Sequence, residues 1–358
     1  MRKVLCVCVL LIASVLGLIA AETEDLKLWY SAPARNWWEA LPVGNSHIGG
    51  MVFGGVAHEE IQLNEETFWA GGPYSNNREG ASAYLNEVRK LIFEGKNSEA
   101  RSLLDAKFMP SQHGMRYLTL GSLRMDFDCE GEVDAYSRDL NLEDATASVR
   151  FRCGGVEYTR RVFTSFADNV MVIELAAGEG SKKMGVDLRY ACPLTSEVKN
   201  EGEYLVMYCN GAEHEGVPAA LHAVVMMRVK SDGKVVCKDG SLSVKDASSA
   251  TILLSAATNF VNYQDVSGDA YAKARRAIEG AWGKPNKILY NEHKETYSEQ
   301  FGRVDLSLPS SEFSKRETDI RINDFNKVED CSLAALMFQY GRYLLISSSQ
   351  PGSQPANL

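Results

Sequence analysis

The spacing of apolar residues changes along the chain, and its middle part has the period of β-strands. From Leu118 to Phe260 apolar and polar residues alternate, so that Leu123, Met125 and Phe127 fall on one side of a segment. Alternation of this kind is typical of strands with one buried face. At least eight such runs follow one another with no helical pattern between them. The pattern excludes a parallel βαβ sheet and favours a mainly β fold built on a large antiparallel β-sandwich.

Glycine-containing pairs divide these runs at regular intervals. Gly154-Gly155 separates two strand-like segments, and Asp232-Gly233 and Asp239-Gly240 mark two further turns. Because glycine adopts positive φ without steric cost, a Gly-Gly pair suits the two-residue turns of tight hairpins. We therefore expect a hairpin at Gly154-Gly155.

Helical spacing interrupts the strands near the start and replaces them after residue 260. The periodicity predicts helices over residues 81–93, 98–107, 270–282, 287–301 and 331–346. Residues 303–309 return to strand-like alternation, and residues 310–330 are polar and irregular, as in a linker.

The first 21 residues differ from the rest. Arg2 and Lys3 precede an apolar run from Val4 to Ile19, and small residues then lead into an acidic stretch. This order describes a cleaved secretory signal. The alternative is a retained membrane anchor, but the run is shorter than the ~20 residues that a spanning helix needs. We expect export to the periplasm or the extracellular space, without stable membrane insertion after cleavage.

Composition and charge exclude several classes of protein for this chain. Of 358 residues, 45% are hydrophobic and 24% are charged, which excludes a disordered chain, a collagen-like fibre and a polytopic membrane protein. The net charge of −9 argues against a nucleic-acid partner, because such binding depends on Lys and Arg neutralising phosphates. Beyond the signal six cysteines remain, an even number that permits disulfides but fixes no pairing.

Generic catalytic and metal-binding motifs are absent from the sequence. His47, His58 and His113 lack metal-ligand spacing, so we expect surface or hydrogen-bonded roles for them and no metal or cofactor. Five aromatic residues near the start of the chain have two interpretations. Their flat rings could bind the faces of sugars, or they could pack in the core and between domains. They are Trp29, Tyr30, Trp37, Trp38 and Trp69.

Several long strings resemble the amino-terminal portion of glycoside hydrolase family 95, which contains secreted α-L-fucosidases. They include residues 28–34 (LWYSAPA), 38–45 (WEALPVGN), 49–55 (GGMVFGG) and 62–73 (QLNEETFWAGGP). The similarity reappears near the end, in residues 334–346 and 348–358. One departure is His47-Ile48, where the family more often has Arg-Leu.

The resemblance implies an amino-terminal β-sandwich, a linker, an (α/α)6 catalytic barrel and a final β domain. We accordingly expect a signal peptide in residues 1–21, the β-sandwich in 22–265, a helical linker in 266–330 and the first helix of the barrel in 331–358. Twelve helices of average length need roughly 140 residues, so the chain looks like a fragment that lacks most of the barrel. The family's inverting mechanism uses a Glu acid and an Asp base within the barrel. Both would lie beyond residue 358, and we assign no catalytic residue.

Five residues remain as candidates for binding a fucosylated oligosaccharide or polysaccharide. Asn64, Glu65 and Trp69 fall on an expected loop after a strand, where Trp69 would stack on a sugar and Glu65 would accept its hydroxyls. Gln354 and Asn357 follow the barrel helix and would hydrogen-bond the same sugar. The alternative for all five is a structural role in turns and packing. The alternative for the protein is a non-catalytic carbohydrate-binding or structural β-sandwich.

Overall fold

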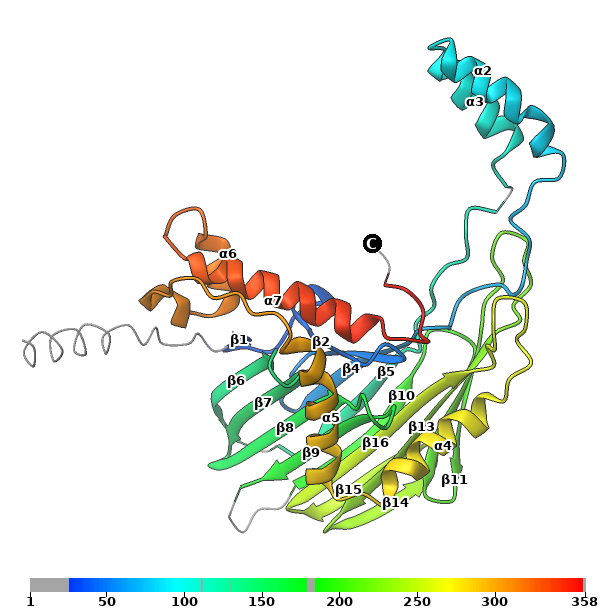
Figure 1. The fold of residues 1–358 in the computed structure, drawn as a ribbon. Coiled ribbons are helices and arrows are strands. Elements are labelled where there is room, and N and C mark those ends of the chain that lie inside the picture. Colours follow the sequence, from blue (N-terminus) through cyan, green and yellow to red (C-terminus); the bar gives the residue numbers. More distant parts are fainter. Residues whose placement is uncertain (1–25, 111, 130, 179–183, 357–358) are drawn as a thin grey trace, which may run out of the picture.

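The computed structural model describes residues 26–356, apart from residues 111, 130 and 179–183. In this part the chain forms two antiparallel sheets, and helices lie over the outer face of the larger one (Figure 1). The mainly β fold predicted from the sequence is confirmed. The expected signal segment, residues 1–21, lies outside the described residues.

The larger sheet has nine strands within the described residues. Their order is β1 (Lys27–Tyr30), β6 (Val133–Asn141), β7 (Thr146–Cys153), β8 (Val156–Thr164), β9 (Met171–Ala177), β16 (Ser249–Thr258), β13 (His222–Ser231), β12 (Tyr204–Asn210) and β11 (Ser196–Glu201).

The smaller sheet has seven strands within the same part of the chain. Their order is β14 (Lys234–Lys238), β15 (Ser241–Ala247), β10 (Met184–Ala191), β5 (Ser122–Phe127), β4 (His58–Glu65), β3 (Ile48–Val52) and β2 (Leu41–Gly44).

The main core lies between the sheets, and a second apolar layer covers the outer face of the larger one. Along β9, Met171 and Ile173 face the main core, whereas Val172 belongs to the second layer. Helix α4 (Ala270–Trp282) supplies Ala274 and Ile278 to that second layer, and α5 (Asn286–Phe301) continues it. The central strands are therefore buried on both faces.

The Gly154-Gly155 hairpin is formed as predicted, between β7 and β8. Both glycines have positive φ, 56° and 81°, as a two-residue hairpin turn requires. A disulfide joins Cys153, at the end of β7, to Cys129, which follows β5. Because β7 and β5 belong to different sheets, this bond links the two layers of the sandwich.

Two short helices stand apart from the sandwich on extended connections (Figure 1). They are α2 (Leu85–Phe93), which follows the 3-10 turn η2 (Ala81–Tyr84), and α3 (Asn97–Lys107). Their positions agree with the helical periodicity of the sequence.

The segment before the last helix departs from expectation in two ways. Residues 303–309 form no strand, since their backbone lies beside a helix: Arg342 donates to the carbonyl of Val304 and Gln339 to the carboxylate of Asp305. The polar stretch 310–330 is partly helical, with η3 (Glu312–Lys315) and α6 (Thr318–Asp324). The remaining short helix is η1 (Trp37–Glu39).

Helix α7 (Cys331–Ser348) packs against β2 and so ends beside the smaller sheet (Figure 1). The Tyr343 hydroxyl donates to the carbonyl of Pro42 at 2.6 Å, and the N–H of Ser46 donates to the carbonyl of Ser347 at 2.6 Å. A Cβ atom at Gly44 would come within 2.9 Å of that Ser347 oxygen, so the close approach requires glycine. None of the described helices is long and apolar enough to cross a bilayer.

Candidate functional site

A hollow of about 290 Å³ opens where β3 and β4 meet the end of α7. Most of its lining comes from three parts of the chain: the β2–β3 hairpin, β4 with the segment that follows it, and the end of α7 with the tail after it. Its lining includes His47, Gly49, Asn64, Glu66, Trp69, Tyr117, Ser347 and Gln354.

The β2–β3 turn presents His47 to this hollow. Ser46 has φ of 76°, and the Asn45 side chain stabilises the turn by accepting the N–H groups of His47 and Ile48 at 3.2 and 3.0 Å. The Asn45 amide also donates to the carbonyl of Ser165, in the β8–β9 turn of the larger sheet, at 2.8 Å. The position of His47 is therefore fixed against both sheets.

Glu66 connects this turn to the tail of the chain. Its Oε1 lies 2.5 Å from Nδ1 of His47, and its Oε2 accepts the backbone N–H of Gln354 at 2.5 Å. The hydrogen bond that His47 donates to the Glu66 carboxylate raises the pKa of His47, against the opposing effect of partial burial. Since both carboxylate oxygens of Glu66 have partners, this side chain holds the wall of the hollow together.

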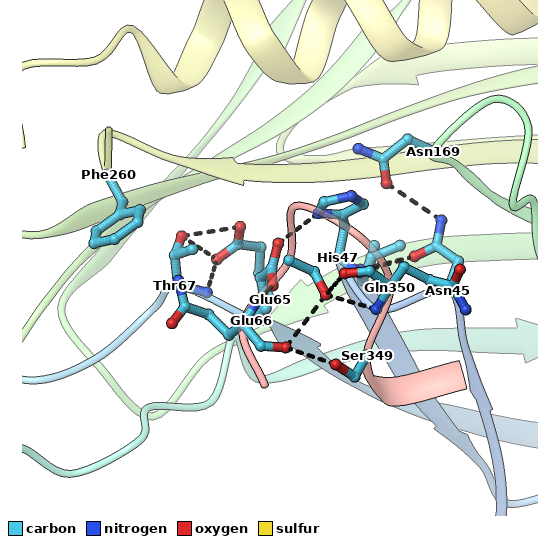
Figure 2. A network of polar contacts seen from close by, with 12 residues as sticks. Asn45, His47, Glu65, Glu66, Thr67, Asn169, Phe260, Ser349 and Gln350 are labelled. Atoms are coloured by element: carbon cyan, nitrogen blue, oxygen red, sulfur yellow. Dashed lines mark hydrogen bonds and ion pairs between the residues drawn. The ribbon is translucent and has the colours of Figure 1, made fainter. Parts of the chain in front are cut away.

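Glu65 faces a second hollow, of about 280 Å³, which shares His47, Glu66 and Gln354 with the first. Glu65 is 7% exposed, and its carboxylate accepts the backbone N–H of Thr67 at 2.7 Å and the Thr67 hydroxyl at 2.8 Å. Figure 2 shows Glu65 and Thr67 directed toward each other, next to the contact between His47 and Glu66. Burial raises the pKa of Glu65 to about 7.

Trp69 and Tyr117 form an aromatic pair at the edge of the first hollow. Phe68 is fully buried, so the next residue turns outward, and a single antiparallel bridge places Tyr117 beside it. The ring centroids of Trp69 and Tyr117 are 4.9 Å apart, with 56° between the ring planes. The Trp69 Nε1–H donates to the carbonyl of Glu66, and the Tyr117 hydroxyl donates to that of Glu65. Trp69 is 37% exposed, which leaves part of its ring free for a ligand.

The structure brings three of the predicted site residues to one hollow: Asn64, Trp69 and Gln354. Asn64 and Glu65 are the last residues of β4 and not part of a loop, because they pair with Gly49 and Ile48 of β3. Asn357 lies outside the described residues.

Sequence reasoning missed two contributors, His47 and Tyr117, and it placed Glu66 in the segment with Glu65 and Trp69 without identifying its partners. The sequence assigned His47 only a surface or hydrogen-bonded role, and its partner stands 19 positions away. For Tyr117 the available signal was its place in residues 117–123 (YLTLGSL), a further stretch that resembles family 95. No local pattern pairs it with Trp69.

The hollow places exposed aromatic surface beside amide, imidazole and carboxylate groups. In general, aromatic rings suit the apolar faces of sugars, and polar groups of these kinds suit their hydroxyls. Among residues 26–356 with the stated gaps, no three His, Cys, Asp or Glu side chains are grouped so as to hold a metal ion.

Comparison with protein families divides the chain into two parts. Residues 28–263 match the model described as glycosyl hydrolase family 65, N-terminal domain. Residues 286–358 match that of the glycosyl hydrolase family 95 catalytic domain. The residues between β1 and Tyr117 that line the hollow belong to the first match, and Gln354 belongs to the second.

The chain is also similar to curated relatives and to a solved structure. The chain is 32% identical to "Alpha-L-fucosidase 2" of Arabidopsis thaliana, over 94% of this chain and 43% of the plant protein. It is 27% identical to "Probable alpha-fucosidase A" of Aspergillus niger, over 89% of this chain and 42% of the fungal protein. The chain thus spans less than half the length of these two relatives. A "Putative kojibiose phosphorylase from human microbiome" shares the fold at a TM-score of 0.55 and 8% identity, over 91% of this chain and 42% of that one.

Proposed function

This chain belongs to the family of the glycosyl hydrolase family 65 N-terminal domain, here followed by a segment of a family 95 catalytic domain, and we propose that it is the amino-terminal part of an α-L-fucosidase-type hydrolase. The resemblance to the amino-terminal portion of family 95 is confirmed. The proposed substrates are glycans with terminal α-L-fucosyl residues. The names of the plant and fungal relatives support this substrate class.

The observation that carries the proposal is the junction at the first hollow. His47, Glu66 and Trp69 come from the family 65 match, and Gln354 comes from the family 95 match. The sandwich therefore contributes one wall of a hollow whose other residues belong to the catalytic domain. We infer that Trp69 stacks on the sugar, and that Asn64 and Gln354 hydrogen-bond its hydroxyls.

We assign the bond-breaking groups to the part of the catalytic domain beyond residue 358. An inverting glycosidase needs a carboxylic acid and a base about 6.5–9.5 Å apart, with a water between the base and the sugar. Glu66 has both oxygens bound to His47 and Gln354, and both oxygens of Glu65 are occupied by Thr67. These contacts favour a positioning role for both carboxylates. Within this proposal, residues 22–265 are the sandwich, 266–330 the linker and 331–358 the start of the barrel.

The proposal includes export of the protein to the periplasm or the extracellular space. The amino-terminal segment has the order of a secretory signal, and the disulfide between Cys129 and Cys153 suits an oxidising compartment.

The experiment compares residues 22–358 with a chain that includes the whole catalytic domain, using 4-nitrophenyl α-L-fucoside. The longer chain should release β-L-fucose first, as proton NMR of the fresh product would show, and residues 22–358 should give no turnover. Initial release of α-L-fucose would contradict the inverting mechanism. Turnover by residues 22–358 would place the catalytic groups within this chain. If the longer chain bound fucosylated glycans without hydrolysing them, the alternative of a carbohydrate-binding protein would replace the proposal.

A further inference from the structure

Two cysteines that share no disulfide lie side by side between the sheets. The Sγ atoms of Cys192 and Cys209 are 3.3 Å apart, and both residues are free thiols in the structure. A disulfide has a sulfur–sulfur distance of about 2.05 Å, so the two sulfur atoms need to come only about 1.2 Å closer to form one.

The two cysteines belong to different sheets of the sandwich. Cys192 follows β10 in the seven-stranded sheet, and Cys209 lies in β12 of the nine-stranded sheet. Cys209 is 1% exposed and part of the main core, whereas Cys192 is partly exposed at its edge. The pair thus spans the same two layers that Cys129 and Cys153 already join.

We propose that Cys192 and Cys209 are a modification site: they form a second disulfide between the sheets, by exchange with a low-molecular-weight disulfide such as oxidised glutathione. Cys192 is the residue that solvent reaches, and Cys209 is the buried partner that completes the bond. This inference does not depend on the proposed hydrolase activity.

The exchange balances in two steps. The Cys192 thiolate attacks one sulfur of oxidised glutathione, forming a mixed disulfide and releasing one glutathione thiolate. The Cys209 thiol then loses its proton to water, attacks Sγ of Cys192 and releases the second glutathione. The hydrogen bond from the Cys209 thiol lowers the pKa of Cys192 to about 6, which favours Cys192 as the first nucleophile.

Peptide mapping tests the proposal on the full chain. The purified protein is incubated with oxidised glutathione and then denatured in the presence of iodoacetamide, which alkylates the remaining free thiols. It is then digested with trypsin. Cleavage after Arg189, Lys199 and Arg228 places the two cysteines in separate peptides, 190–199 and 200–228, each with a single cysteine. We expect mass spectrometry to find these peptides linked. The linked peptides 125–138 and 153–160, which carry Cys129 and Cys153, are the positive control.

A matched pair of variants adds a second measurement. Oxidation should raise the melting temperature of the wild type by about 5 °C, as expected for closing a loop of this length. Cys331→Ser, at an exposed free cysteine, should keep this rise, and Cys192→Ser should lose it. Recovery of peptides 190–199 and 200–228 as separate alkylated species, while the control peptides are linked, would overturn the proposal. The mapping uses the wild type, so it remains decisive even if Cys192→Ser folds poorly.

Discussion

Glu66 accepts the backbone N–H of Gln354 at 2.5 Å, although 288 positions separate the two residues. Glu66 directly follows β4 of the sandwich, and Gln354 lies in the tail after α7. This one side chain therefore joins the two parts of the chain that match different hydrolase domains. The contact also brings the predicted residues Trp69 and Gln354 to one hollow.

The ion pair between His47 and Glu66 predicts a measurable titration. The pKa of His47 is raised above its usual 6.5, so the charged pair is fully present below that pH and is lost as the pH rises through the folded-state pKa. Replacing Glu66 by Gln should return the pKa of His47 toward 6.5, as NMR titration of the imidazole would show. Glu197→Gln, on β11 of the other sheet, should leave the titration unchanged. An unaltered His47 titration in Glu66→Gln would contradict the pairing.

Glu65 predicts a loss of stability toward neutral pH. Its carboxyl group ionises near 4.5 when unfolded and near 7 when folded, so the unfolded chain gives up this proton first. The free energy of unfolding should therefore fall between pH 4.5 and 7, by about 3 kcal/mol from this group. Denaturant unfolding of Glu65→Gln should lack this decrease. The prediction is wrong if wild type and variant show parallel pH profiles across that range.

His293 predicts the opposite dependence at acid pH. Its side chain is fully buried on α5, with Nε2 2.8 Å from the carbonyl of Asp144, and burial lowers its pKa to about 4. Because the unfolded imidazole takes up a proton below about 6.5, stability should fall by about 3 kcal/mol between pH 6.5 and 4. His293→Gln should remove this component of the acid sensitivity, and His222→Gln, at an exposed site on β13, should retain it. Equal acid sensitivity in the two variants would contradict the assignment.

Exposed apolar side chains on α7 predict self-association. Met337 is 66% exposed and Leu345 62%, with Phe338 and Leu344 partly exposed beside them. Apolar surface of this kind favours association in water. Met337→Glu combined with Leu345→Lys should reduce association in light scattering and leave the melting temperature within about 2 °C, because both positions are at the surface. Leu336→Glu, at a site 1% exposed, should unfold the chain. Unchanged association in the double variant would show that this face is not responsible.

The sequence predicted the elements whose causes are local. Period-two alternation identified the strands, the Gly-Gly pair identified the β7–β8 hairpin, and helical spacing placed α4 and α5 to within a residue. Residues 303–309 show the limit of such reasoning. Their alternation resembles that of a strand, but a strand also needs a neighbouring strand to hydrogen-bond its backbone. Here the side chain of Arg342, on α7, donates to the carbonyl of Val304 instead.

The site was predictable only in part, because its contacts join distant segments. Trp69 and Gln354 were found through the resemblance to family 95. That resemblance identifies residues in the sequence but does not show which of them touch. No local pattern connects Glu66 with Gln354, and the partial exposure of Trp69 depends on the burial of Phe68 and the pairing with Tyr117.

The central claim is that the hollow between the sandwich and α7 binds the sugar of the substrate, and the kinetics of Trp69→Ala test it most directly. In a chain with the whole catalytic domain, losing the stacking surface should raise KM for 4-nitrophenyl α-L-fucoside by about tenfold and leave kcat within about twofold. Trp38→Ala is the control, since Trp38 is 86% exposed and does not line the hollow. The account predicts a raised KM for Trp69→Ala alone. An unchanged KM in Trp69→Ala, or an equal rise in both variants, would contradict it.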